Sequence, residues 1–181
     1  VGDAQDARGA AMHKLAAAIQ FSVPGVPSVY YGDETGMSGM LDPFNRAPFT
    51  TGKRPLVEWY QVLGEARNGH DALSVGSAAF SAPHPDVLCV LRCVTAGLDE
   101  LGGKAENGAC LAVINRSSYA QEVVCDLWLD NAGLTERELE ELRGMGFTKA
   151  ACLLCGEELP VGNGLVKLSL EPESAHIYVL S

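Results

Sequence analysis

The sequence has no long apolar run and little positive charge. No stretch approaches the ~18 consecutive apolar residues that a membrane-spanning helix needs, and the first residues lack the basic-then-apolar order of a signal peptide. Thirteen basic residues against twenty-three acidic ones give a formal net charge of −10. Because phosphate binding needs clustered lysine and arginine, we expect no nucleic-acid partner and no membrane partner. We expect a cytoplasmic location.

Cysteine is absent before Cys89, and the six cysteines all fall in the later part of the chain: Cys89, Cys93, Cys110, Cys125, Cys152 and Cys155. An even number invites a disulfide interpretation. In a chain of 181 residues that is 47% apolar, buried thiols are the simpler one. Cys89 and Cys93 share the parity of Val87 and Leu91 on one strand, which favours core packing.

Cys152 and Cys155 form a C-x-x-C pair, for which two interpretations stay open. One is a metal or redox site. The other is a structural strand, which the intervening Leu153 and Leu154 favour. A zinc site would want a second pair of ligands with suitable turns, so we expect no metal and no cofactor.

The first part of the chain combines helical periodicity with one short apolar run. Asp3–Phe21 is amphipathic and ends at Pro-Gly, and Leu56–Asn68 is a second amphipathic segment that Gly69 closes. Between them, Val26–Tyr31 is bounded by Pro-Gly and Gly-Asp-Glu, as expected for a buried strand. The polar loop after it is where function is expected, because a rigid strand positions such groups.

From about Ser74 onward the periodicity becomes that of strands. The candidates are Ser74–Phe80, Val87–Thr95, Ala109–Asn115, Gln121–Leu127, Ala150–Leu154, Leu165–Leu168 and Ala175–Leu180. Leu134–Arg143 is predicted as a surface helix capped by Thr135 with Glu138 three residues on. Short antiparallel strands with turn signals indicate a sandwich.

The segment PGVPSVYYGDETGM, followed by DPFNR and Pro48-Phe49, resembles the last barrel strand and the loop after it in the α-amylase family of glycoside hydrolases (glycoside hydrolase family 13). The similar branch is the neopullulanase, cyclomaltodextrinase and maltogenic amylase group. CLAVINRSS and LEPESAHIYVL resemble strands of the family's carboxyl-terminal domain. The resemblance implies a mixed α and β fold, with residues 1–70 as the end of a (β/α)8 catalytic barrel and residues 71–181 as an all-β antiparallel sandwich domain.

The resemblance also implies a parent enzyme that hydrolyses or transfers α-1,4 or α-1,6 glucans by a retaining two-carboxylate mechanism. The family's nucleophile, acid/base and stabilising aspartate would lie upstream of Val1, so we expect no catalytic residue in this chain and no activity of the chain alone. Asp42 and Arg46 match the family's D-P-x-N-R motif, in which they hold sugar hydroxyls. The alternative is a turn in which the two residues merely pair with each other. Phe44 departs from the family pattern and leaves linkage preference open.

Other candidate residues favour structural roles. Asp33 and Glu34 are neighbours on an extended segment, so structural hydrogen bonding at the rim of the barrel is favoured over an acid–base pair. Tyr30 and Tyr31 could stack on sugar rings, but a strand would place them on opposite faces, so at least one should pack. His70 and the proline-flanked His84 are predicted turn residues.

Two other classes of function stay open. One is a non-catalytic amylase-like protein, and the other is a carbohydrate-binding or interaction module, which the scarcity of aromatics in the predicted sandwich disfavours. An α-glucan or maltooligosaccharide is the expected ligand of the parent. Helices that came from a barrel would expose apolar faces, so self-association through them is also expected.

Overall fold

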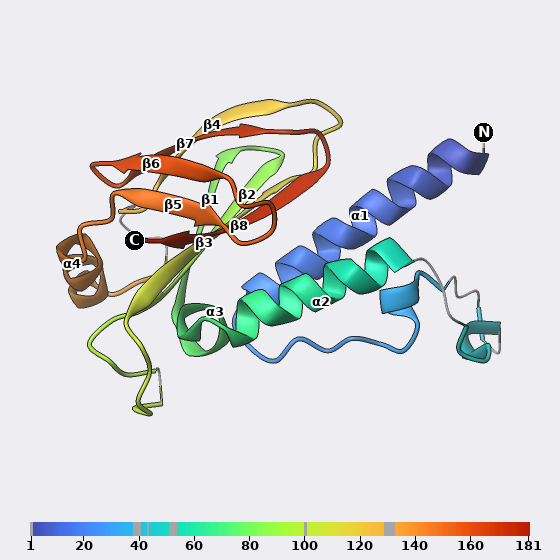
Figure 1. The fold of residues 1–181 in the computed structure, drawn as a ribbon, viewed down its shortest axis with the longest axis horizontal. Helices are drawn as coiled ribbons and strands as arrows, with labels where there is room; N and C mark the ends of the chain where they lie inside the picture. Colours follow the sequence, from blue (N-terminus) through green and yellow to red (C-terminus); the bar gives the residue numbers. More distant parts are fainter. Residues whose placement is uncertain (1, 38–40, 43, 51–53, 100, 129–132) are drawn as a thin grey trace.

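The architecture is one curled antiparallel sheet, with the helices of residues 2–75 on its outer face and one further helix at one end of the sheet (Figure 1). The computed structural model describes residues 2–37, 41–42, 44–50, 54–99, 101–128 and 133–181. The eight strands are β1 (Ser77–His84), β2 (Val87–Val94), β3 (Gly108–Asn115), β4 (Gln121–Asp126), β5 (Lys149–Cys152), β6 (Glu158–Gly162), β7 (Leu165–Leu170) and β8 (Ser174–Leu180). The helices are α1 (Gly2–Ser22), α2 (Arg54–Asn68), α3 (Asp71–Val75) and α4 (Glu136–Gly144), with 3₁₀ turns η1 (Asp33–Thr35) and η2 (Phe44–Arg46).

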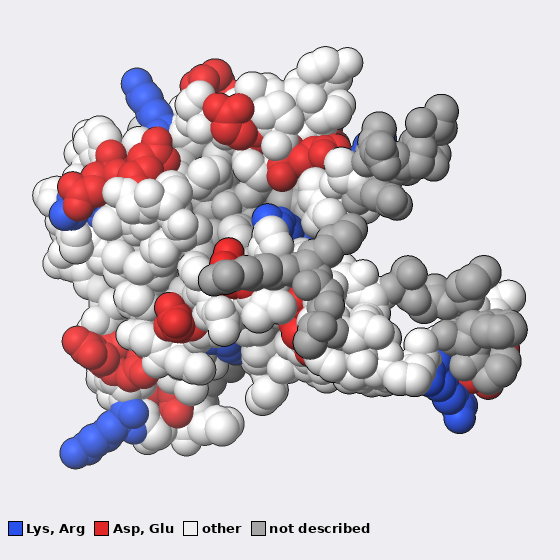
Figure 2. All heavy atoms as spheres, turned by 45° about the vertical axis from the view of Figure 1, so that its right-hand side comes forward, with Lys and Arg blue, Asp and Glu red and all other residues white. Residues whose placement is uncertain are grey.

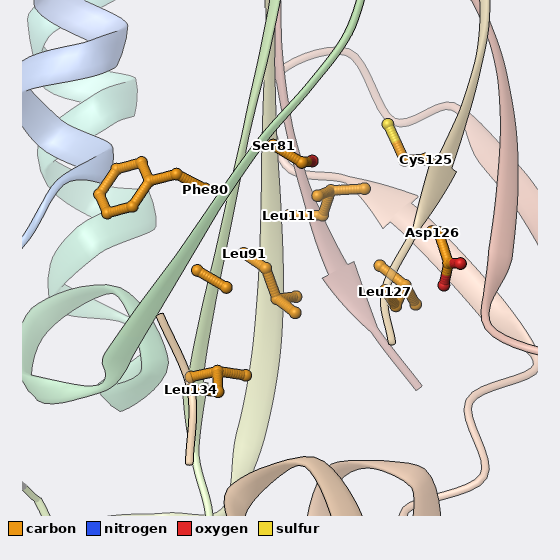
Figure 3. A pocket seen from close by; sticks show the side chains of 9 residues that line it. Phe80, Ser81, Leu91, Leu111, Cys125, Asp126, Leu127 and Leu134 are labelled. Atoms are coloured by element: carbon orange, nitrogen blue, oxygen red, sulfur yellow. The ribbon is translucent and has the colours of Figure 1, made fainter. Parts of the chain in front are cut away.

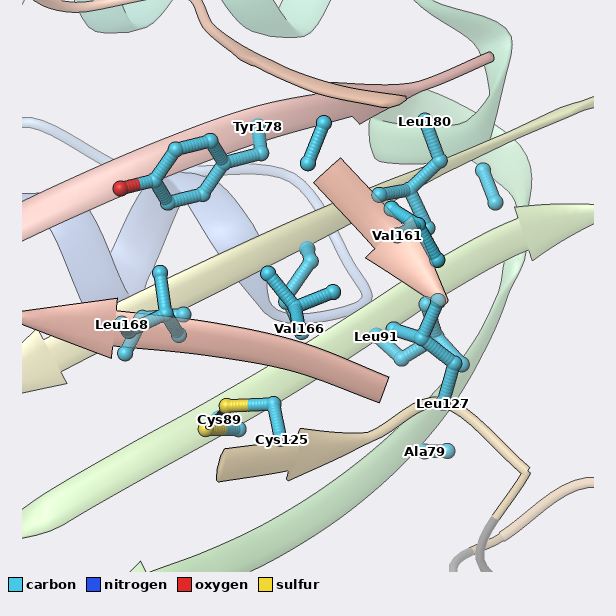
Figure 4. Packing of buried hydrophobic residues seen from close by; sticks show 14 of the residues in the cluster. Ala79, Cys89, Leu91, Cys125, Leu127, Val161, Val166, Leu168, Tyr178 and Leu180 are labelled. Atoms are coloured by element: carbon cyan, nitrogen blue, oxygen red, sulfur yellow. Dashed lines mark hydrogen bonds between the residues drawn. The ribbon is translucent and has the colours of Figure 1, made fainter. Parts of the chain in front are cut away.

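The strand order is β1-β2-β3-β8-β5-β6-β7-β4. The sheet curls until β4, at one edge, contacts β1 at the other. Its concave side therefore encloses a core to which all eight strands contribute (Figure 4). Leu91, Leu111 and Tyr178 stand in register across β2, β3 and β8 on this inner face.

The same three strands are also buried on their outer face. Val90, Ala112 and Ile177 form the matching outward row, which packs against α1, α2 and α3. From the helices come Leu15, Ala18, Leu63 and Leu73, all at most 4% exposed. Because both faces are covered, β2 and β3 are almost continuously apolar and do not alternate as a half-exposed strand does.

Two buried arginines attach the end of α1 to the rest of the molecule. Arg67 of α2, 5% exposed, donates from Nη1 to the carbonyl oxygens of Phe21 (2.7 Å) and Val23 (3.2 Å). Arg92 of β2, 1% exposed, donates to the carbonyl oxygens of Ser22 (2.8 Å) and Gly76 (2.6 Å). The last carbonyl groups of a helix lack hydrogen-bond donors within the helix, and they carry the negative end of its dipole. A cationic donor supplies the missing hydrogen bond and also compensates the negative charge.

Most predicted elements of the later chain are confirmed. All seven predicted strands are present, and α4 has the predicted cap: the Thr135 side chain accepts from the Glu138 amide, and the Glu138 carboxylate accepts from the Thr135 amide. The prediction missed β6, which contains Pro160 and buries only Val161 to a high degree. Cys89 and Cys93 lie in the inner core as predicted, and all six cysteines are free thiols.

Val26–Tyr31 does not form the predicted buried strand in the structure of this chain. These residues form no ladder, and Val26 is 93% exposed and Tyr30 62% exposed. The described strand pairs all lie between residues 77 and 180, so no described strand pairs with this segment. Its contact with α1 is a hydrogen bond from Gln20 Nε2 to the Ser28 carbonyl (2.7 Å).

Replacing Arg92 with methionine should strongly destabilise the fold. The change keeps much of the side-chain volume but leaves the Ser22 and Gly76 carbonyls without their cationic donor. Each unsatisfied buried group costs about 1–3 kcal/mol, so urea unfolding should show a loss of about 2–5 kcal/mol. Arg137→Met is the matched control, because Arg137 lies on the surface and pairs with Glu141 (2.9 Å), and its loss should stay below about 1 kcal/mol. Equal losses for the two variants would contradict this assignment.

Candidate functional site

The predicted sugar-binding pair lies on the loop that links α1 to α2. Arg46 Nε is 3.0 Å from Asp42 Oδ1, and the two side chains are 74% and 63% exposed. The structure thus has the ion pair that formed the alternative interpretation. An exposed pair of this kind contributes little to stability, and it also leaves guanidinium and carboxylate accessible to hydroxyl groups. The subsite role of Asp42 and Arg46 stays a prediction.

Asp33 and Glu34 form the η1 turn beside α2. Glu34 Oε2 accepts a hydrogen bond from the Gly32 amide (2.9 Å), which is a structural hydrogen bond of the kind predicted for this pair. Gly32 has φ 93°, and a Cβ there would lie 2.7 Å from the sulfur of Met37, so only glycine fits. The pKa of Tyr60 on α2 is raised by burial and by these two nearby carboxylates. Tyr60 also contacts His13 of α1, whose Nε2 lies 2.9 Å from its hydroxyl, a contact that the sequence did not predict.

Tyr30 and Tyr31 do not point to opposite faces. Their ring centroids are 4.9 Å apart with an interplanar angle of 49°, and both rings are exposed. The Tyr31 hydroxyl donates to the Ala47 carbonyl (3.1 Å) and so connects the two ends of the loop. The prediction that one of them packs in a core is wrong, because it assumed the alternation of a strand that does not form. His70 caps the start of α3, outside the helices, as predicted for a turn residue, whereas His84 is the last residue of β1 and the turn follows it at residues 85 and 86, so the prediction for His84 is wrong by one position.

Three cavities lined by described residues lie away from this loop. A groove of about 440 Å³ runs between α1 and the β1–β2 turn, with Met12, Leu15 and Ile19 on one side and Leu88 and Ile114 on the other. A second hollow of about 320 Å³ lies between α3 and the ends of β3 and β8. The space in Figure 3, among residues of β1, β2, β3 and β4, is about 10 Å³ and could hold no more than one water. Asp42 and Arg46 line none of these three.

A further group of chemistry-bearing side chains lies where β5 turns into β6. Strand β5 ends at Cys152, and residues 153–155 form a turn, so the prediction that Leu153 and Leu154 continue the strand is wrong. The turn places Cys155 beside Cys152, and β8 places His176 beside both: its Nδ1 is 3.9 Å from each sulfur. Burial, together with the neighbouring Cys155, raises the pKa of the Cys152 thiol, and burial lowers the pKa of His176.

The surface charge is dispersed. On the face drawn in Figure 2, acidic side chains are spread over the surface and basic ones stand apart from one another. Among the described residues, no helix combines the length and apolarity that crossing a bilayer requires.

Comparison with known proteins relates the chain to α-glucan-processing enzymes. No protein-family model matches it. It is 32% identical over 115 residues to an amylopullulanase of Thermoanaerobacterium saccharolyticum, covering 62% of this chain and 9% of that protein. It is 30% identical over 158 residues to a cyclomaltodextrinase of Geobacillus thermopakistaniensis, covering 82% of this chain and 24% of that protein. An Anoxybacillus α-amylase structure superposes with a TM-score of 0.74 at 25% identity, covering 95% of this chain and 32% of that one.

The chain corresponds to a C-terminal portion of the α-amylase family of glycoside hydrolases. The predicted relationship is confirmed, and so is the antiparallel β domain, which matches that of the α-amylase structure. The chain spans between 9% and 24% of the length of the two curated relatives described.

Proposed function

We propose that this chain works as the carboxyl-terminal part of a retaining glycoside hydrolase or transglycosylase that acts on α-1,4 or α-1,6 glucans. Residues 1–70 would close a (β/α)8 barrel, and residues 71–181 would form the β domain packed against it. The observation that carries the proposal is the similarity to amylopullulanase and cyclomaltodextrinase, joined to the superposition on an α-amylase across 95% of the chain. The catalytic carboxylates would come from other strands of the barrel.

The exposed segment Val26–Tyr31 supports this proposal. It is largely apolar, yet the described structure pairs it with no strand and leaves Val26, Val29, Tyr30 and Tyr31 exposed. Unpaired backbone and exposed apolar side chains are what a central barrel strand presents when neighbouring strands are missing. In the proposed enzyme these neighbours would cover it, and the loop with Asp42 and Arg46 would then line the substrate cleft.

The proposal is tested by comparing the 181-residue chain with the proposed longer protein that carries the rest of the barrel. We expect the chain alone to leave soluble starch, pullulan and cyclodextrin intact, and the longer protein to hydrolyse at least one of them with retention of the α-configuration, followed by proton NMR of the first product. A longer protein without activity on any of these glucans would favour the non-catalytic alternative. Inversion of configuration would exclude the proposed mechanism.

In that longer protein, the double change Asp42→Ala and Arg46→Ala should weaken action on long substrates. Hydrogen bonds to charged groups are worth about 1.5–3 kcal/mol, so kcat/KM for a long maltooligosaccharide should fall by about tenfold or more, with a smaller effect on maltotriose. Lys149→Ala with Glu158→Ala is the matched control, because it removes another exposed ion pair (2.9 Å) on the β domain. Unchanged kinetics with the Asp42 and Arg46 variant would contradict the subsite role.

The isolated chain should self-associate through its uncovered apolar surface. Light scattering should give a mass above 19.1 kDa that rises with concentration, and Val26→Asp should shift it toward the monomer, since a charge opposes burial of that segment. Leu101→Asp is the control, because Leu101 is 96% exposed but lies on the β2–β3 hairpin loop. A clean monomer at high concentration would count against this prediction.

A further inference from the structure

Three ligand atoms converge at the β5–β6 turn. The sulfurs of Cys152 and Cys155 and Nδ1 of His176 all lie within 4.8 Å of one another, and each sulfur is 3.9 Å from Nδ1. In a tetrahedral zinc site the metal–ligand bond lengths imply about 3.6 Å between sulfur and nitrogen and about 3.8 Å between sulfurs. Each sulfur–nitrogen distance is therefore about 0.3 Å longer than in such a site, and the sulfur–sulfur distance exceeds it by at most about 1 Å, so small side-chain adjustments would let the three atoms bind one ion.

The turn has the backbone geometry that holds two thiolates on one ion. The Gly156 amide donates to the Cys152 carbonyl (2.9 Å), and Gly156 has φ 77°, so the chain reverses directly after the second cysteine.

The third ligand is fixed against this turn before any metal binds. The Leu153 amide donates to the Ile177 carbonyl (2.7 Å), which holds the turn to β8 beside His176. The His176 ring stacks on Tyr178 at 5.9 Å with an interplanar angle of 18°. Its Nε2 is buried and has no partner among the described residues, so Nδ1 is the nitrogen that the ring presents to the sulfurs.

We propose that Cys152, Cys155 and His176 form a zinc-binding site that staples the β5–β6 turn to β8. Two thiolates and one imidazole suit zinc and exclude calcium and magnesium, which prefer oxygen ligands. Cys155 is exposed, so the ion can enter from solvent, and a water molecule takes the fourth tetrahedral position. The site lies on the β domain and does not depend on the proposed glucan chemistry.

The test uses the full 181-residue chain, stripped with a chelator under reducing conditions and then dialysed against Zn²⁺. Metal content by mass spectrometry should give one zinc per chain, and the melting temperature should rise with zinc. Cys155→Ser should lower zinc affinity, measured by competition with a chromophoric chelator, by at least about tenfold, since loss of even outer partners of a metal site costs about 10 to 100-fold. Because Cys155 is exposed, this variant should fold like the parent chain.

His176→Asn should lower the affinity in the same way. Cys110→Ala and His84→Asn are the matched controls, because they remove the same ligand types outside the cluster, and both should bind zinc like the parent chain. The proposal is overturned if the reduced chain binds no zinc, or if Cys155→Ser and His176→Asn bind it unchanged. It is also overturned if alkylation mapping finds a Cys152–Cys155 disulfide in the zinc-treated reduced protein.

Discussion

The packing of helices on sheet depends on two guanidinium groups that meet the end of one helix. Arg67 and Arg92 come from α2 and β2, yet both donate to carbonyl oxygens at or just after the end of α1. A buried cation is costly unless its hydrogen bonds are satisfied, and here the carbonyls of the helix end satisfy it. The direction in which α1 leaves the sheet, and hence the position of the long loop after it, is set at this point.

The β domain was largely predictable from sequence, and the reasons are local. Turn residues and apolar runs mark seven of the eight strands, and Thr135 with Glu138 marks the start of α4. Strand β6 was not predicted, because it contains Pro160 and because most of its side chains are exposed, so its sequence lacks the alternation typical of a strand. Val26–Tyr31 was predicted as a strand from its composition, but a strand also needs neighbours, and composition contains no information about them.

The two candidate sites differ in whether the proximity of their residues could be predicted from the sequence. Asp42 and Arg46 are four residues apart on one loop, so their proximity was visible in the motif. The cluster at the β5–β6 turn was not, because His176 comes from β8, 21 residues beyond Cys155, and only the pairing of β5 with β8 brings it near. The two leucines between the cysteines suggested a strand, whereas the glycine after Cys155 was the overlooked signal of a turn.

Strands β2, β3 and β8 serve two cores at once, since Leu91, Leu111 and Tyr178 face one and Val90, Ala112 and Ile177 face the other. A shift of one residue in the register of any of these strands would turn its inward-facing side chains outward and its outward-facing ones inward. Packing in each core therefore helps to fix the register on which the other core depends. Because the three strands belong to both cores, loss of one core would remove one of the two packed faces of the other core's strands. A boundary between residues 70 and 71 therefore divides the sequence into two segments but cuts through a shared packing interface.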